Sequence, residues 1–139
     1  MAQNQPTPRR LAREVAFQYL YGRFTENQVP DKESFQNFCQ SFEFPVDQFG
    51  WELVAGTTEQ GDAIDNFITQ VSKNWRIERM PKVDLAILRL SVYEILHRPD
   101  IPKTVAINEA IELAKKFGTE GSASFINGIL DKIAKENQG

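Results

Sequence analysis

The sequence is poor in the residues on which most enzyme chemistry depends. It has one cysteine, Cys39, and one histidine, His97, among 139 residues. A single cysteine excludes an internal disulfide and is typical of a chain kept in a reducing compartment. The sequence also lacks a cluster of metal-ligand residues, a Walker-type phosphate loop and a GxGxxG motif. These absences argue against an enzyme, and we expect no cofactor and no metal.

Long apolar segments are missing as well. No stretch reaches about 18 uncharged apolar residues, the length that crosses a bilayer. The first ten residues, MAQNQPTPRR, lack the apolar core of a secretory signal. We therefore expect a cytoplasmic protein without a membrane contact.

Charge is unevenly distributed along the chain. The net charge is −3, but residues 1–24 carry four arginines against one glutamate, which gives this segment +3 and leaves −6 for the remainder. A basic end on an acidic body is typical of two surfaces for two kinds of partner. The basic end can meet phosphate, whereas the acidic body can meet a basic protein.

Apolar residues recur at helical spacing, and no segment alternates as a half-buried strand does. This pattern predicts an all-α fold of about seven helices in two packed helical bundles. We expect a flexible arm over residues 1–7 and a single domain over residues 8–139. A turn divides the domain into an N-terminal helical half (8–75) and a C-terminal helical half (81–139).

Several residues mark the expected helices. Thr7 and Asp31 are predicted N-caps of the first and second helices, and Gly118 is a predicted C-cap. Residues 81–98 are apolar almost all round, which predicts a helix in the middle of a bundle. Helical spacing continues through Gly128, so we interpret Gly128 as a close contact between helices.

The first predicted helix has two different faces at about 100° per residue. One face holds the side chains expected to pack on the bundle, namely Ala12, Val15, Ala16, Tyr19 and Leu20. The adjacent face consists of Arg10, Arg13, Glu14, Phe17 and Tyr21, with Arg9 at the border. Guanidinium groups bind phosphate and aromatic rings stack on unpaired bases, so this face is typical of a single-stranded RNA reader. The alternative is a solvated helix start with Phe17 and Tyr21 in the core.

A second segment can add to this face. Residues 118–125, GTEGSASF, are small and polar and open the last predicted helix. Free backbone N–H groups at such a start, near Ser122, favour phosphate. Phe125 follows and can either stack on a base or pack in the core.

Four segments together resemble the NusB family of bacterial transcription antitermination factors. They are RRLAREVAFQYLY, DLAILRLSVYEIL, IPKTVAINEAIELAKKFG and FINGILDK, and they cover the chain from Arg9 to about Lys132. The resemblance implies two stacked helical bundles that bind boxA RNA of ribosomal operons together with NusE, a small-subunit ribosomal protein. It also implies that the pair helps to load an antitermination complex on RNA polymerase.

The resemblance further implies where the partners bind. RNA would contact Arg9, Arg10, Arg13 and Tyr21 of the first helix and Phe125 of the last. The acidic Glu78 and Asp84 would face NusE, and their charge suits a basic ribosomal protein. Leu11 stands where some members carry a third consecutive basic residue, and Gly121 stands where many carry an acidic one.

Two alternatives stay open beside this hypothesis. The same helical domain precedes the catalytic domain of an rRNA cytosine methyltransferase, so a stand-alone relative of that recognition domain is the first. We expect no catalytic domain here, because no room for one remains after residue 136. A helical protein–protein scaffold without an RNA role is the second, and the arginine–aromatic face argues against it.

Overall fold

The computed structural model describes residues 7–73 and 75–136, and these residues are mostly helical and contain no strand. Apart from Thr7, the predicted N-terminal arm lies outside the described residues. The elements in chain order are α1 (Pro8–Thr25), α2 (Lys32–Ser41), α3 (Gln48–Glu59), α4 (Gly61–Val71), the short 3-10 helix η2 (Ile77–Arg79), α5 (Lys82–His97), α6 (Lys103–Phe117) and α7 (Ser122–Glu136). The predicted all-α fold is confirmed.

Side-chain caps set the starts of the first helices. Thr7 Oγ1 accepts a hydrogen bond from the backbone N–H of Arg10 at 3.2 Å, and the Asp31 carboxylate accepts one from Ser34 at 2.8 Å. Asp47 caps α3 in the same way. Each cap satisfies a backbone donor that has no partner within its own helix, so each helix starts at a defined residue.

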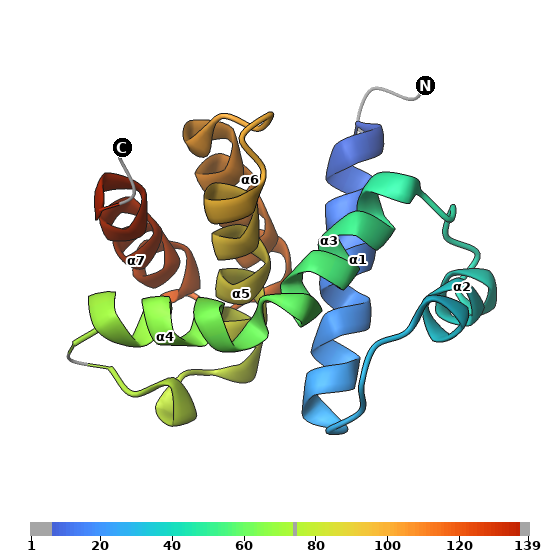
Figure 1. Cartoon of the computed structure of the whole chain (residues 1–139), viewed down its shortest axis with the longest axis horizontal. Helices are drawn as coiled ribbons and strands as arrows, with labels where there is room; N and C mark the ends of the chain where they lie inside the picture. Colours follow the sequence, from blue (N-terminus) through green and yellow to red (C-terminus); the bar gives the residue numbers. More distant parts are fainter. Residues whose placement is uncertain (1–6, 74, 137–139) are drawn as a thin grey trace.

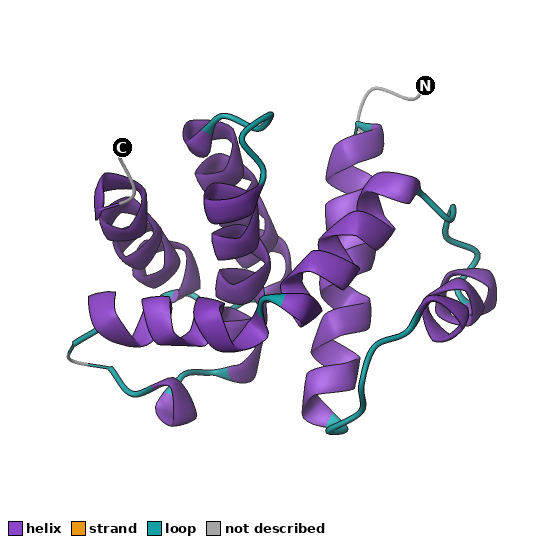
Figure 2. Cartoon of the chain, viewed as in Figure 1, coloured by secondary structure: helices purple, strands orange, loops and turns teal. Residues whose placement is uncertain are grey.

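The helices form two groups (Figure 1). α1, α2 and α3 lie on one side, and α4, α5, α6 and α7 lie on the other. Loops join consecutive helices, and the longest connection, from α4 to α5, contains η2 (Figure 2). α4 packs on α5 and α7, so the division in space falls between α3 and α4, at Gln60, and not at the turn near residues 74–80.

α5 lies at the centre of the molecule and packs on α1, α3, α4, α6 and α7. Its apolar residues are buried on several sides, and even its Ser91 and Glu94 are buried. The prediction of a central helix over residues 81–98 is therefore confirmed. Because α5 contacts both groups of helices, the two groups share one continuous core.

The glycine prediction was wrong at one position. Gly128 is exposed, and a Cβ atom there would meet open space. The close contact lies instead at Gly56 of α3, where a Cβ atom would overlap the ring of Tyr93 on α5. Helical spacing shows that a residue belongs to a helix but not which neighbour covers it. Gly118 is the C-cap of α6, as predicted.

Candidate nucleic-acid interface

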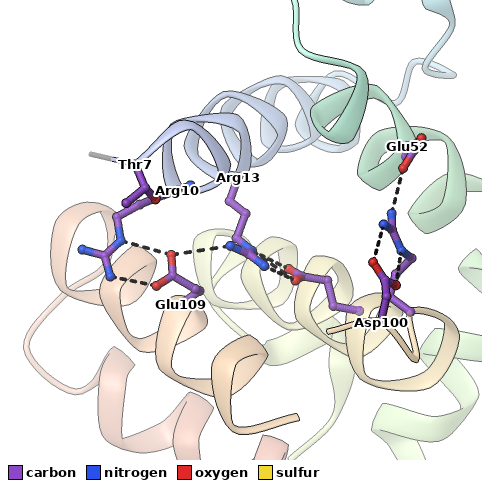
Figure 3. Close-up of polar contacts among 8 residues, drawn as sticks. Thr7, Arg10, Arg13, Glu52, Asp100 and Glu109 are labelled. Atoms are coloured by element: carbon purple, nitrogen blue, oxygen red, sulfur yellow. Dashed lines mark hydrogen bonds and ion pairs between the residues drawn. The ribbon is translucent and has the colours of Figure 1, made fainter. Parts of the chain in front are cut away.

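The first turn of α1 presents two arginines at the surface. Arg9 is exposed, and its guanidinium lies 4.2 Å from the centroid of the Phe49 ring. Arg10 donates hydrogen bonds to Glu109 of α6 from Nε at 3.1 Å and from Nη2 at 2.7 Å (Figure 3). Its side chain still keeps 43% of its surface exposed, and the contact with Glu109 raises the pKa of Arg10. Both guanidinium groups are therefore charged and accessible to a phosphate.

Arg13 lies inside the molecule and not on the surface, where the sequence placed it. Its side chain is 5% exposed and donates hydrogen bonds to Glu94 of α5 from Nε at 3.0 Å and from Nη2 at 2.7 Å. Nη1 lies 3.7 Å from Glu109. Burial raises the pKa of Glu94, and the hydrogen bonds and charge of Arg13 oppose that rise. The guanidinium is thus used to hold α1 against α5, a neighbour that the helical wheel of α1 does not reveal.

A further ion pair joins α1 to α6. Lys116 Nζ of α6 lies 2.6 Å from the Glu14 carboxylate of α1, and the Lys116 side chain is 57% exposed. Sequence reasoning missed Lys116 as a candidate contact for phosphate. The signal was present, because Lys115, Lys116 and Phe117 repeat the combination of cationic and aromatic side chains seen on α1.

The two aromatic rings of α1 that were predicted to stack on bases differ in burial. Phe17 is buried, and its ring centroid lies 4.9 Å from that of Phe117 and 6.0 Å from that of Tyr21. Phe17 therefore belongs to the core, because α6 covers the face that the sequence left open. Tyr21 is half-buried at the edge of a groove of about 340 Å³. The groove is lined by Phe17, Gln18, Tyr21, Phe38, Phe42, Val83 and Phe117.

Ser122 and Asp84 are buried against each other. Ser122 Oγ donates a hydrogen bond to Asp84 Oδ1 at 2.7 Å and accepts one from the backbone N–H of Thr119 at 3.0 Å. The sequence placed Ser122 on the RNA surface and Asp84 on the surface that faces NusE, whereas the structure places both inside. Their contact ties the start of α7 to the start of α5, and a contact between residues 38 apart leaves no local signal in the sequence.

Phe125 faces α4 and not the side chains of α1. Its ring meets that of Trp75 edge to face, with 5.5 Å between the centroids. Both residues line a groove of about 530 Å³ between α4 and α7. In Figure 1, α5 and α6 separate α7 from α1. The aromatic residues of the predicted RNA surface are therefore divided between two grooves, Phe17 and Tyr21 at one and Phe125 at the other.

Glu78 is exposed in η2, and it remains a candidate contact for a basic partner. The arginines on either side, Arg76 and Arg79, are exposed too. The local surface is consequently mixed in charge and less acidic than the prediction assumed.

The described residues contain no group of three or more histidine, cysteine or acidic side chains placed to hold a metal ion. Cys39 is buried, and burial raises the pKa of its thiol, which disfavours the nucleophilic thiolate. The His97 ring stacks on that of Tyr93, with 5.6 Å between the centroids. Among the described helices, none is long and apolar enough to span a membrane.

Comparison with known proteins gives a consistent result. The model of the NusB family matches residues 10–135. The transcription antitermination protein NusB of Geotalea daltonii is 51% identical over 135 residues, which cover 91% of this chain and 93% of that protein. The protein of the same name from Geobacter sulfurreducens is 52% identical over 128 residues, with the same coverage of 91% and 93%.

Solved structures agree with this similarity in sequence. NusB of T. maritima superposes with a TM-score of 0.82 at 36% identity, covering 97% of this chain and 96% of that one. A crystal structure of the antitermination factors NusB and NusE with double-stranded RNA contains a chain that superposes with a TM-score of 0.81 at 26% identity, covering 92% and 96%. The seven α-helices of the described residues, the family match over most of the chain and these relatives together show that the chain belongs to the NusB family of transcription antitermination proteins.

Proposed function

We propose that this protein is an RNA-binding adaptor in transcription antitermination. It binds boxA-type single-stranded RNA of ribosomal operons together with NusE, and it helps to assemble an antitermination complex on RNA polymerase with the other factors. It acts in the cytoplasm, without catalysis and without a cofactor. The observation that carries the proposal is the accessible pair of guanidinium groups at the start of α1, Arg9 and Arg10, in a chain of the NusB family.

The contacts at this surface divide into charge and stacking. Arg9, Arg10 and Lys116 supply cations for phosphate oxygens, which give affinity without reading sequence. Tyr21 supplies an aromatic edge beside the groove at the far end of α1. Phe125, half-buried beside Trp75, supplies a second ring for a base. Arg13 and Phe17 are buried, and they contribute indirectly by fixing the position of α1.

The proposed partner NusE is supported by a relative rather than by a contact in this chain. The similar chain of 26% identity was crystallised with NusE and double-stranded RNA. Glu78 remains the proposed acidic contact for NusE. Asp84 is proposed to act indirectly, because its bond to Ser122 positions α7 against α5.

The experiment is fluorescence anisotropy of labelled RNA with the full-length protein. Three RNAs are compared: a boxA-type single strand, a scrambled single strand and a boxA duplex. Each is titrated with and without NusE at two salt concentrations. We expect the boxA single strand to bind more tightly than the other two, and we expect NusE to increase that affinity.

Other results would redirect the proposal. Equal binding of the boxA and scrambled strands would leave only an electrostatic surface and remove the sequence-reading role. Tighter binding of the duplex would indicate that the protein recognises double-stranded RNA and not a single strand. An absence of RNA binding even with NusE would favour a protein–protein scaffold.

A further inference from the structure

Each of two exposed cations on the surface formed by α1 and α6 is paired with a carboxylate from the facing helix. Arg10 of α1 pairs with Glu109 of α6, with Nη2 and Oε2 2.7 Å apart. Lys116 of α6 pairs with Glu14 of α1, with Nζ and Oε1 2.6 Å apart. The two pairs run in opposite directions, so each helix gives one cation and one carboxylate.

In both pairs the carboxylate is more buried than the cation. The Arg10 and Lys116 side chains are 43% and 57% exposed, whereas those of Glu109 and Glu14 are 13% and 11% exposed. The cations therefore form the outer layer and the carboxylates lie beneath them. Figure 3 shows the contacts from Arg10 and Arg13 converging on Glu109, so two arginines fix this carboxylate in place.

This arrangement weakens the attraction for an RNA phosphate. A phosphate that approaches Arg10 or Lys116 meets a cation whose charge is offset by a carboxylate at hydrogen-bond distance. Because both carboxylates are largely buried, salt screens their charge less than it screens that of an exposed side chain. The same carboxylate also competes with the phosphate for the donors of the cation.

We propose that Glu109 and Glu14 limit the affinity of this surface for RNA. The inference rests on the proposed function, since it requires that α1 and α6 face RNA. The carboxylates act on charge and not on base identity, so they weaken the binding of boxA and scrambled RNA by the same factor. Removing either carboxylate therefore increases absolute affinity and leaves the preference between RNA sequences unchanged.

A purely structural role predicts a different outcome. If the two ion pairs only join α1 to α6, removing a carboxylate lowers the melting temperature and leaves RNA affinity unchanged or reduced. The sign of the change in RNA affinity therefore separates the two roles.

The experiment uses the full chain carrying Glu109→Gln, Glu14→Gln or both. Asp131→Asn is the matched control, because it removes one negative charge from an exposed ion pair with Lys135 on α7. Single strands of boxA-type and scrambled sequence are titrated by anisotropy over a series of salt concentrations. The melting temperature of each variant is also measured. Glutamine keeps the shape of the side chain, so we expect these variants to fold.

One fully freed cation adds at most about 0.7 to the steepness of the slope of log affinity against log salt for a single strand, which is a gain of at most about fivefold near 0.1 M salt. We expect this change for each single variant with both RNAs, the product of the two gains for the double variant, and no comparable change for Asp131→Asn. Adding Arg10→Ala to Glu109→Gln should abolish the gain.

Unchanged or lower affinity for both RNAs in folded Glu109→Gln and Glu14→Gln would overturn the inference. An equal gain in Asp131→Asn would overturn it too, because net charge would then be the cause. Should Glu109→Gln not fold, Glu14→Gln decides alone. A gain for both RNAs without any preference for boxA in the unmodified protein would support the inference while removing the proposed sequence-reading function.

Discussion

The three arginines of RRLAR have different environments although they lie within five residues. Arg9 is exposed against the Phe49 ring, Arg10 is half-exposed beside Glu109, and Arg13 is buried on Glu94. The first two keep surface that a phosphate can reach, although Glu109 already accepts hydrogen bonds from Nε and Nη2 of Arg10. The third contributes to the position of α1, which makes the residue-level account testable by stability as well as by binding.

Replacing Arg13 by methionine should destabilise the fold. The change leaves the Glu94 carboxylate buried without its cation, which costs about 3–5 kcal/mol of the free energy of unfolding. Replacing Glu94 by leucine in the same chain should recover most of this loss, because the pair is then apolar. Urea denaturation of the two variants measures both effects. Unchanged stability in Arg13→Met would show that the pair is not structural.

The cost of Arg13→Met should depend on pH. Burial already raises the pKa of Glu94, and loss of Arg13 removes the effect that opposes this rise. Between the unfolded and folded pKa values, the folded state binds more protons, so stability falls as pH increases. The loss relative to the unmodified protein should therefore be smaller near about pH 4 than near about pH 8. Equal losses at both pH values would contradict a raised pKa.

At the scale of the elements, α5 is the helix against which the others are positioned. Its N-terminal Asp84 holds α7 through Ser122, its Glu94 holds α1 through Arg13, and its Tyr93 lies against Gly56 of α3. Each contact comes from a different side of α5. Substitutions on α5 should consequently lower the stability of the whole fold rather than alter one binding surface alone.

Asp84→Ala and Ser122→Ala should each lower stability by about 1.5–3 kcal/mol, because each removes a buried hydrogen bond to a charged group. The double variant should lose less than the sum, since both changes remove the same bond. Denaturation of the three variants tests this coupling. Additive losses would show that the two residues act independently.

For the contact with NusE, Glu78→Lys is the clearer probe, because Glu78 is exposed.

Two glycine-to-alanine changes within helices should have opposite effects. At Gly56 a Cβ atom would overlap the Tyr93 ring, and such overpacking costs about 1–3 kcal/mol. At Gly128 the Cβ atom enters open space, so Gly128→Ala should stabilise α7 by about 0.5–1 kcal/mol. Thermal melting compares the two variants. A loss at Gly128 would revive the prediction of a close helix contact there.

At the scale of the whole molecule, the sequence predicted the helices and their caps well. Helical spacing and caps such as Thr7 and Asp31 are local, so they can be read from neighbouring residues. Candidate surface residues were harder, because burial depends on which helix packs against which. Arg13 and Phe17 lie on a polar or mixed face of α1, and α5 and α6 cover that face in the fold.

Pairing between residues far apart in the chain could not be predicted from the sequence either. The bond from Ser122 to Asp84 and the pair of Lys116 with Glu14 join residues that no local pattern connects. The family resemblance supplied Arg9, Arg10, Arg13, Tyr21 and Phe125 as candidates. The structure exposes Arg9, leaves 43% of the Arg10 side chain exposed and places Tyr21 and Phe125 at grooves, but it buries Arg13.

The central claim is that the exposed pair at the start of α1, and not Arg13, binds RNA phosphate. The most direct test is the salt dependence of binding to a boxA-type single strand for three proteins: the unmodified chain, Arg9→Ala with Arg10→Ala, and Arg13→Met with Glu94→Leu. Removing the exposed pair should flatten the slope of log affinity against log salt by about 0.7 for Arg9 and by a smaller amount for Arg10, whose charge Glu109 offsets. The buried swap should leave the slope unchanged. A flattened slope in the buried swap, with a normal slope in the other variant, would contradict the account.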